Sequence, residues 1–212
     1  MGPLRASGAD GAARLIEDVA MRRLPVQTRE ALDDDGRQVW DSITATRGSI
    51  VTNEGALLGP FNAWVTAPGI GGRVAELGAA LRFASSIERR LLEVAIITIG
   101  ARWHAEFEWW AHSRMALRHG VSQDAVDAIA RGASPALADD ERVVYAVARQ
   151  LVDNGRVDQT TYDAAHSLLG DRGIVELVTL CGYYTLVSFT LNAFEVGLPP
   201  GEATIWPTGG AS

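Results

Sequence analysis

Two histidines and three glutamates fall between Glu93 and His112, in the segment EVAIITIGARWHAEFEWWAH. The second half of this segment places His104, Glu108 and His112 at intervals of four residues. On a helix, side chains at that spacing lie along one face, each turned by about 40° from the one before. Because a histidine beside a carboxylate can exchange a proton near neutral pH, the stripe predicts an acid–base site.

We assign His112 as the acid–base residue and leave its carboxylate partner open between Glu93 and Glu108. A carboxylate that holds the second ring nitrogen fixes the tautomer of the imidazole and raises its basicity. Aromatic walls would exclude water from such a site. The residues that we expect to contact a substrate are Trp103, Trp109, Trp110, His104, Asn62 and Asn192. The competing interpretation is core packing for the tryptophans, and helix capping or loop bracing for the asparagines.

Two histidines and a carboxylate are also suitable ligands for zinc or iron. On one helix, however, His104 and His112 would lie about 12 Å apart along the axis. A single ion with ligand bonds of about 2 Å cannot easily reach both. One histidine and Glu108 together with Glu93 remain an alternative ligand set, but we expect no native metal.

The cationic residues of the chain are all arginine, because the sequence contains no lysine. This excludes a lysine Schiff base, covalent attachment of pyridoxal phosphate and a P-loop lysine. A substrate carboxylate must therefore pair with arginine, and Arg82, Arg102 and Arg114 are the nearest to the stripe in sequence. The single cysteine, Cys181, excludes an internal disulfide and a CxxC pair, and its apolar neighbours predict a buried structural thiol.

The overall composition is that of a soluble globular protein. The net charge is −7 and the pI about 5.1, with no basic cluster that could follow a phosphate backbone, so we expect no nucleic-acid partner. No apolar run reaches the roughly 18 residues of a transmembrane helix. The first residues lack the apolar core of a signal peptide, so we expect a cytoplasmic protein without membrane association.

Helical periodicity and capping signals run along most of the chain, without the alternating pattern of strands, so the fold class expected is all-α. We divide the chain into an N-terminal extension (1–20), a helical domain (21–200) and a loose C-terminal tail (201–212). The last helix is apolar nearly all round between Val175 and Phe194. Such a helix needs neighbours on every side, which predicts a homo-oligomer. The helices expected are Pro68 to Phe83, one from Ser85 or Ser86 onward, Trp103 to Arg118, Ser122 to Ala130, Ala138 to Val152, Asp158 to Gly170, and Gly173 to Phe194.

The pattern Glu93…Trp103…Glu108-Trp-Trp-Ala-His112, followed by Gly120-Val-Ser, resembles the carboxymuconolactone decarboxylase family, which includes the alkylhydroperoxidase D-like (AhpD-like) proteins. GPFNAW at 59–64 and GYYTLVSFTLNAF at 182–194 extend the likeness to most of the helical domain. The resemblance implies an AhpD-like helical bundle that commonly assembles as trimers or hexamers.

The peroxidase branch of this family carries a glutamate, a CxxC pair and a histidine. Glu93 and His112 match that pattern, but the cysteine positions fall on Ala105 and Glu108. A thiol peroxidase needs its thiolate nucleophile, so we expect no such activity. The decarboxylase branch implies a carbon–carbon lyase acting on a carboxylated lactone or a similar carbon acid, without metal or organic cofactor. A thiol-independent oxidoreductase and a catalytically silent ligand-binding or assembly protein are the alternatives.

Overall fold

The computed structural model describes residues 23–47, 50–52 and 55–206. These residues form α-helices and one short 3-10 helix, and the only β-pairing among them is two isolated bridges. The all-α prediction is therefore confirmed, whereas the predicted extension at 1–20 lies outside the described residues. The helices are η1 (Arg29–Ala31), α2 (Asp34–Thr46), α3 (Phe61–Thr66), α4 (Pro68–Phe83), α5 (Arg89–Arg102), α6 (Glu106–Arg118), α7 (Gln123–Ala130), α8 (Asp139–Asn154) and α9 (Gln159–Ala193).

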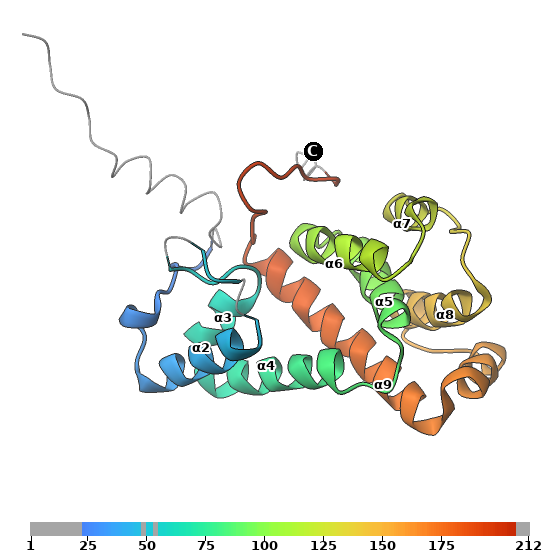
Figure 1. Ribbon diagram of the computed structural model, residues 1–212, viewed down its shortest axis with the longest axis horizontal. Coiled ribbons are helices and arrows are strands. Elements are labelled where there is room, and N and C mark those ends of the chain that lie inside the picture. Colours follow the sequence, from blue (N-terminus) through green and yellow to red (C-terminus); the bar gives the residue numbers. More distant parts are fainter. Residues whose placement is uncertain (1–22, 48–49, 53–54, 207–212) are drawn as a thin grey trace, which may run out of the picture.

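Helix α9 passes through the middle of the molecule, with α2, α3 and α4 on one side and α5 to α8 on the other (Figure 1). Gly170 interrupts it with a left-handed backbone, at φ 66° and ψ 179°. The helix end predicted at Gly170 is thus present as a kink. By length and composition α9 could cross a membrane, and 44% of its most apolar window is buried in the described protein; one such helix is weak evidence of a membrane span.

Helix α5 is the most deeply buried element, since every residue from Leu91 to Gly100 is buried. A residue of α9, Glu176, holds the turn before the N-terminus of α5. The Glu176 carboxylate accepts hydrogen bonds from the Ser85 hydroxyl at 2.8 Å and from the Ser86 amide at 2.7 Å. These bonds hold the turn before α5 and so set where the helix begins.

The turn between α5 and α6 corrects one prediction. Helix α6 begins at Glu106, and His104 lies in the turn at φ 48°, so His104 does not share a helical face with Glu108 and His112. The turn is closed by the Ala105 amide, which donates to the Gly100 carbonyl at 2.9 Å. A left-handed residue after a helix is usually glycine, and a histidine there gives no signal in the sequence.

The described part of the C-terminal tail, residues 201–206, is anchored rather than loose. The Glu202 carboxylate pairs with Arg114 at 2.7 Å. The Trp206 amide donates to Glu106 at 2.6 Å, and the indole of Trp206 packs against Trp109. The side chains of Glu202 and Trp206 therefore attach the described part of the tail to α6.

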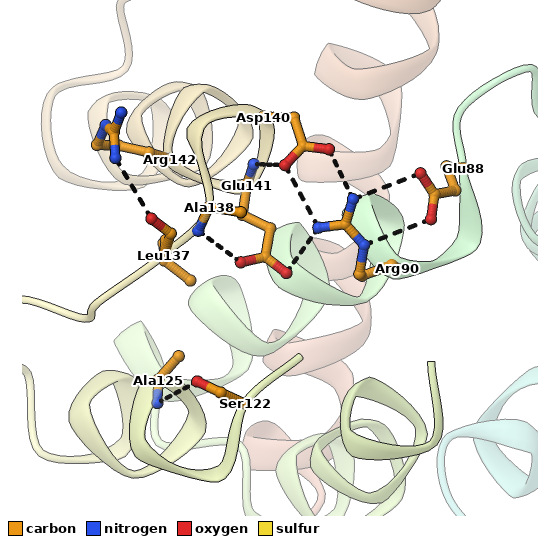
Figure 2. Close-up of polar contacts among 9 residues, drawn as sticks. All are labelled: Glu88, Arg90, Ser122, Ala125, Leu137, Ala138, Asp140, Glu141 and Arg142. Atoms are coloured by element: carbon orange, nitrogen blue, oxygen red, sulfur yellow. Dashed lines mark hydrogen bonds and ion pairs between the residues drawn. The ribbon is translucent and has the colours of Figure 1, made fainter. Parts of the chain in front are cut away.

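Arg90, on the first turn of α5, ties this helix to the start of α8 (Figure 2). Its guanidinium lies 2.6 Å from Asp140 and 2.7 Å from Glu141, and Glu88 is 3.4 Å away. Glu141 is 5% exposed and also accepts from the Ala138 amide at 3.0 Å, which caps α8. Hydrogen bonds to Asp140 and Glu141 raise the pKa of Arg90.

We expect Arg90→Met to lower the free energy of unfolding by about 2 kcal/mol, because it leaves the buried Glu141 without its cation. Urea denaturation followed by circular dichroism measures the change. Arg142→Met is the matched control, because its partner Asp139 and Arg142 itself are both exposed. A loss no larger for Arg90→Met than for this control would show that the cluster in Figure 2 contributes nothing to stability.

One side of α9 remains open to solvent and is apolar. Its exposed side chains follow helical spacing: Val175 is 65% exposed, Val178 43%, Leu186 42% and Phe189 50%. Exposed apolar residues on α4 include Ile70 and Phe83. A contiguous apolar surface of this kind marks an interaction site more often than an ordinary surface.

Self-association therefore stays a prediction, with the open side of α9 as its contact surface. We expect light scattering to give a multiple of 22.7 kDa, and the double variant Val178→Glu/Leu186→Glu to dissociate it. Leu168→Glu, on the same helix before the kink and 41% exposed, is the control and should leave the assembly intact. A monomer of the unaltered protein, stable on dilution, would contradict the prediction.

Candidate acid–base site

Helices α5 and α6 bring Glu93 and His112 together in the interior. Nδ1 of His112 lies 2.6 Å from Oε2 of Glu93, and the two residues are 5% and 0% exposed. When the Glu93 carboxylate is ionised it can only accept, so Nδ1 carries the hydrogen. The predicted contact between His112 and a glutamate is thus present, and the Nε2 atom remains for chemistry.

Glu93 is also paired with Arg89, one helical turn before it on α5, at 2.8 Å from Oε1. Burial raises the pKa of Glu93, but the charge of His112, its hydrogen bond and then Arg89 together outweigh burial, and the pKa is lowered. The Glu93 carboxylate therefore stays ionised at neutral pH.

Glu108 meets the same imidazole from the other side. Its Oε1 lies 3.1 Å from Nε2 of His112, one turn away on α6, and it accepts no hydrogen bond from the described residues. Burial raises the pKa of Glu108 more strongly than His112 and Arg82 lower it, so the net shift is upward. Both candidate carboxylates thus contact His112, one at each ring nitrogen and with opposite pKa shifts.

A cavity of about 570 Å³ opens beside this cluster. His112 and Glu108 line it, whereas Glu93 lies behind His112 and does not. The ring of Tyr184 meets the imidazole edge-on, with 5.2 Å between the ring centres. The walls are largely aromatic and come from α3, α6 and α9: Phe61, Trp64, Phe107, Trp110, Tyr183 and Tyr184.

Of the tryptophans expected at the site, only Trp110 lines this cavity. Trp109 is buried in a second core cluster and packs against Trp206. Trp103 packs edge-on against Phe189, with 4.8 Å between the ring centres. Successive residues of a helix point in different directions, so neighbouring tryptophans cannot share one wall.

The other three residues expected to contact substrate have different partners. His104 stacks on Trp206 and faces a separate surface cavity near α7. Asn62 is buried, accepts from the Gln27 amide at 2.7 Å and donates to the Pro25 carbonyl at 3.0 Å. Asn192 donates to the Trp103 carbonyl at 2.7 Å. Both asparagines therefore brace backbone, which was the competing interpretation.

The sequence left three arginines open as partners of a substrate carboxylate, and the structure shows which of them line the cavity. Arg82 lines the cavity, and so does Arg114, which is neutralised by Glu202. Arg102 lies outside it and pairs with Asp153 at 2.7 Å. The cavity adds Arg47, which the sequence analysis missed, because a residue 65 positions from His112 is brought there only by the fold.

Cys181 is buried in the core of α9, and burial raises the pKa of its thiol to about 12. A thiol with that pKa carries almost no thiolate at neutral pH, so its expected structural role fits its surroundings. Among the residues that the structure describes, no group of three or more histidine, cysteine or acidic side chains is arranged to hold a metal ion.

The arrangement of the helices is the AhpD-like helical fold. The solved structures similar to it include two uncharacterized peroxidase-related proteins, one of them described as an alkylhydroperoxidase AhpD core. The first is from Ralstonia eutropha JMP134, with a TM-score of 0.66 and 15% identity over 82% of this chain and 90% of that one. The second is from Silicibacter sp. TM1040, with a TM-score of 0.61 and 14% identity over 84% and 88%. A protein of unknown function from Agrobacterium tumefaciens has a TM-score of 0.56 and 14% identity over 65% and 95%.

Residues 68–150 match the model of the carboxymuconolactone decarboxylase family. No curated protein matches the sequence. Residues 68–150 are the part of the chain that matches the decarboxylase family, and the helices share the fold of the AhpD-like structures, so the resemblance expected from the sequence is confirmed at these two points. The matched part contains Arg89, Glu93, Glu108 and His112, but not Arg47 or Tyr184.

We expect Glu108→Gln to raise the melting temperature by a few degrees at about pH 7.5. A carboxyl whose folded pKa is raised binds its proton more tightly in the folded state. Above its ordinary value of 4.5 the unfolded state ionises first, and the folded state loses stability as the pH rises toward the raised value. Glutamine cannot ionise and so escapes this loss.

Differential scanning calorimetry across pH measures the effect, which should vanish at a pH well below 4.5, where the carboxyl is protonated in both states. Glu76→Gln is the control, because Glu76 is exposed and pairs only with Arg73 among the described residues. A Glu108→Gln variant less stable than the unaltered protein at neutral pH would show that Glu108 is a structural partner of His112.

Proposed function

We propose that the protein is a cofactor-independent decarboxylase of the carboxymuconolactone decarboxylase type, acting on a carboxylated lactone or a similar carbon acid. The observation that carries the proposal is the placement of His112, with Nδ1 held by the buried Glu93 and Nε2 beside Glu108 on a largely aromatic cavity. This arrangement supports proton transfer to and from one position.

The reaction breaks one carbon–carbon bond and leaves its electron pair on the substrate. Carbon dioxide departs, and the pair is delocalised into the conjugated carbonyl as a dienolate. Glu108, whose raised pKa favours the protonated form, can donate a hydrogen bond to the carbonyl oxygen as negative charge develops. Because Oε1 of Glu108 and Nε2 of His112 are 3.1 Å apart, groups of one substrate can reach both.

Protonation on carbon completes the reaction. The protonated His112 gives its Nε2 hydrogen to the dienolate carbon, and a solvent proton restores the imidazolium. Glu93 does not reach the cavity, so its role is to hold the ring orientation and to stabilise the imidazolium between turnovers. In this scheme Glu93 is a positioning residue, and His112 and Glu108 are the catalytic residues.

Thiol peroxidase chemistry is the activity suggested by the names of the similar structures. It needs a reactive thiolate. The chain has one cysteine, Cys181, which is buried in the core with a raised pKa and does not line the cavity. A silent binding protein is the other alternative, and a buried histidine and a buried acid that line the cavity favour catalysis over it.

We expect His112→Gln to lower kcat/KM about 10²- to 10⁴-fold, because the proton donor is lost. The assay is release of carbon dioxide from a panel of carboxylated lactones. In D₂O, mass spectrometry should find one deuterium in each product molecule. Glu93→Gln should lower kcat and shift its pH profile while KM changes little.

Cys181→Ser is the control and should keep activity within a few-fold, with no thiol-dependent peroxide turnover in either protein. Full activity in His112→Gln would contradict the acid–base assignment. Loss of activity in Cys181→Ser, with folding intact, would mean that the thiol is the reactive group.

A further inference from the structure

Three guanidinium groups line the cavity without a carboxylate partner among the described residues, and two of them are not exposed. These two belong to Arg47, directly after α2, and to Arg82, near the end of α4. We propose that Arg47 and Arg82 form an anion-binding subsite that holds a carboxylate of the substrate beside His112. The inference rests on the proposed function only in placing substrate in this cavity.

Arg47 is the stronger part of the argument, because it is 8% exposed and its Nε–H donates to no acceptor among the described residues. Its one side-chain hydrogen bond runs to the neutral Thr46 hydroxyl at 2.9 Å, and its guanidinium lies 5.3 Å from the centre of the Phe61 ring. Burial and then Arg82 lower the pKa of Arg47, yet an arginine keeps its proton. A buried charge without a counter-ion is costly, and an anionic ligand would supply the counter-ion.

Arg82 faces the same space. Its Nε is buried without a partner, and its terminal nitrogen contacts only the Met115 sulfur, at 3.6 Å. Arg89 donates to the Arg82 carbonyl at 2.9 Å, which places the last turn of α4 against the Glu93–His112 pair. The charge of Arg82 lowers the pKa of both Glu93 and Glu108, so this guanidinium lies near the two carboxylates that contact His112.

The other charged groups of the cavity do not neutralise this pair. Glu108 is the one acidic residue among those lining it, and burial raises its pKa toward the neutral form. Arg114 is taken by Glu202, and Arg118 is exposed. The cavity therefore carries an excess of positive charge in a low-dielectric space, where it attracts an anion more strongly than it would in water.

The residues on the cavity wall further restrict the class of ligand that fits. Phe61 and Trp64 from α3, with Tyr183 from α9, lie beside the two arginines on the cavity wall. Flat apolar walls with a forked cation at one end fit a planar, conjugated ring that carries a carboxylate. Arg47 and α3 precede residues 68–150, so this half of the subsite lies outside the part that matches the family.

Benzoate and benzamide are a matched pair of probes, because they share shape and differ in charge. Isothermal titration calorimetry should be performed on the His112→Gln variant, which is inactive in the proposed function but keeps both arginines. We expect benzoate to bind at least about tenfold more tightly than benzamide. Arg47→Met and Arg82→Met should each abolish this preference, and Arg102→Met, outside the cavity, should retain it.

Equal binding of the two probes would overturn the subsite, as would a preference that persists in both single variants. If Arg47→Met fails to fold, the comparison of the two probes in the parent and in Arg82→Met still decides. Because binding is measured without turnover, a protein that binds benzoate selectively but releases no carbon dioxide would contradict only the proposed reaction. An active protein without selectivity would contradict only the subsite.

Discussion

The fully buried carboxylate of Glu93 is the constraint on which the rest of the structure depends. Removing a carboxylate from water costs several kcal/mol unless charged partners replace the water. Arg89 and His112 do so at 2.8 Å and 2.6 Å. Because His112 belongs to α6, the pair fixes how α5 and α6 lie against each other. The left-handed turn at His104 joins these two helices, and Glu176 holds the turn before α5.

The same burial gives the two carboxylates different functions. Glu93 has charged partners and a lowered pKa, whereas burial dominates at Glu108 and raises its pKa. Two titratable groups whose surroundings separate their pKa values are the usual basis of acid–base assignments. A carboxylate with a lowered pKa thus lies at Nδ1 of His112, and one with a raised pKa lies at Nε2. The cysteine that the peroxidase branch has in place of Glu108 would give the same scaffold a different reaction.

Much of the fold and the centre of the site could be predicted from the sequence. Helix α4 begins and ends where Pro68 and Phe83 predict, and Ser122 caps α7 through the Ala125 amide. Helix ends and caps of this kind can be predicted because they depend on residues that are close in sequence. The position of His104 and the role of Arg47 could not be predicted, since the first has a left-handed backbone without glycine and the second depends on contacts between distant segments.

The site is therefore built from two sources. Residues 68–150 supply the acid–base group, and this is the part of the chain that matches the family. The segment before it and α9 supply Arg47, the aromatic walls from α3, and both tyrosines. Tyr184 packs edge-on against His112, whereas Arg47, Phe61 and Trp64 line the cavity without a ring contact to it. In the proposed function, residues 68–150 would therefore set the reaction, and the segment before them would set which substrate the cavity accepts.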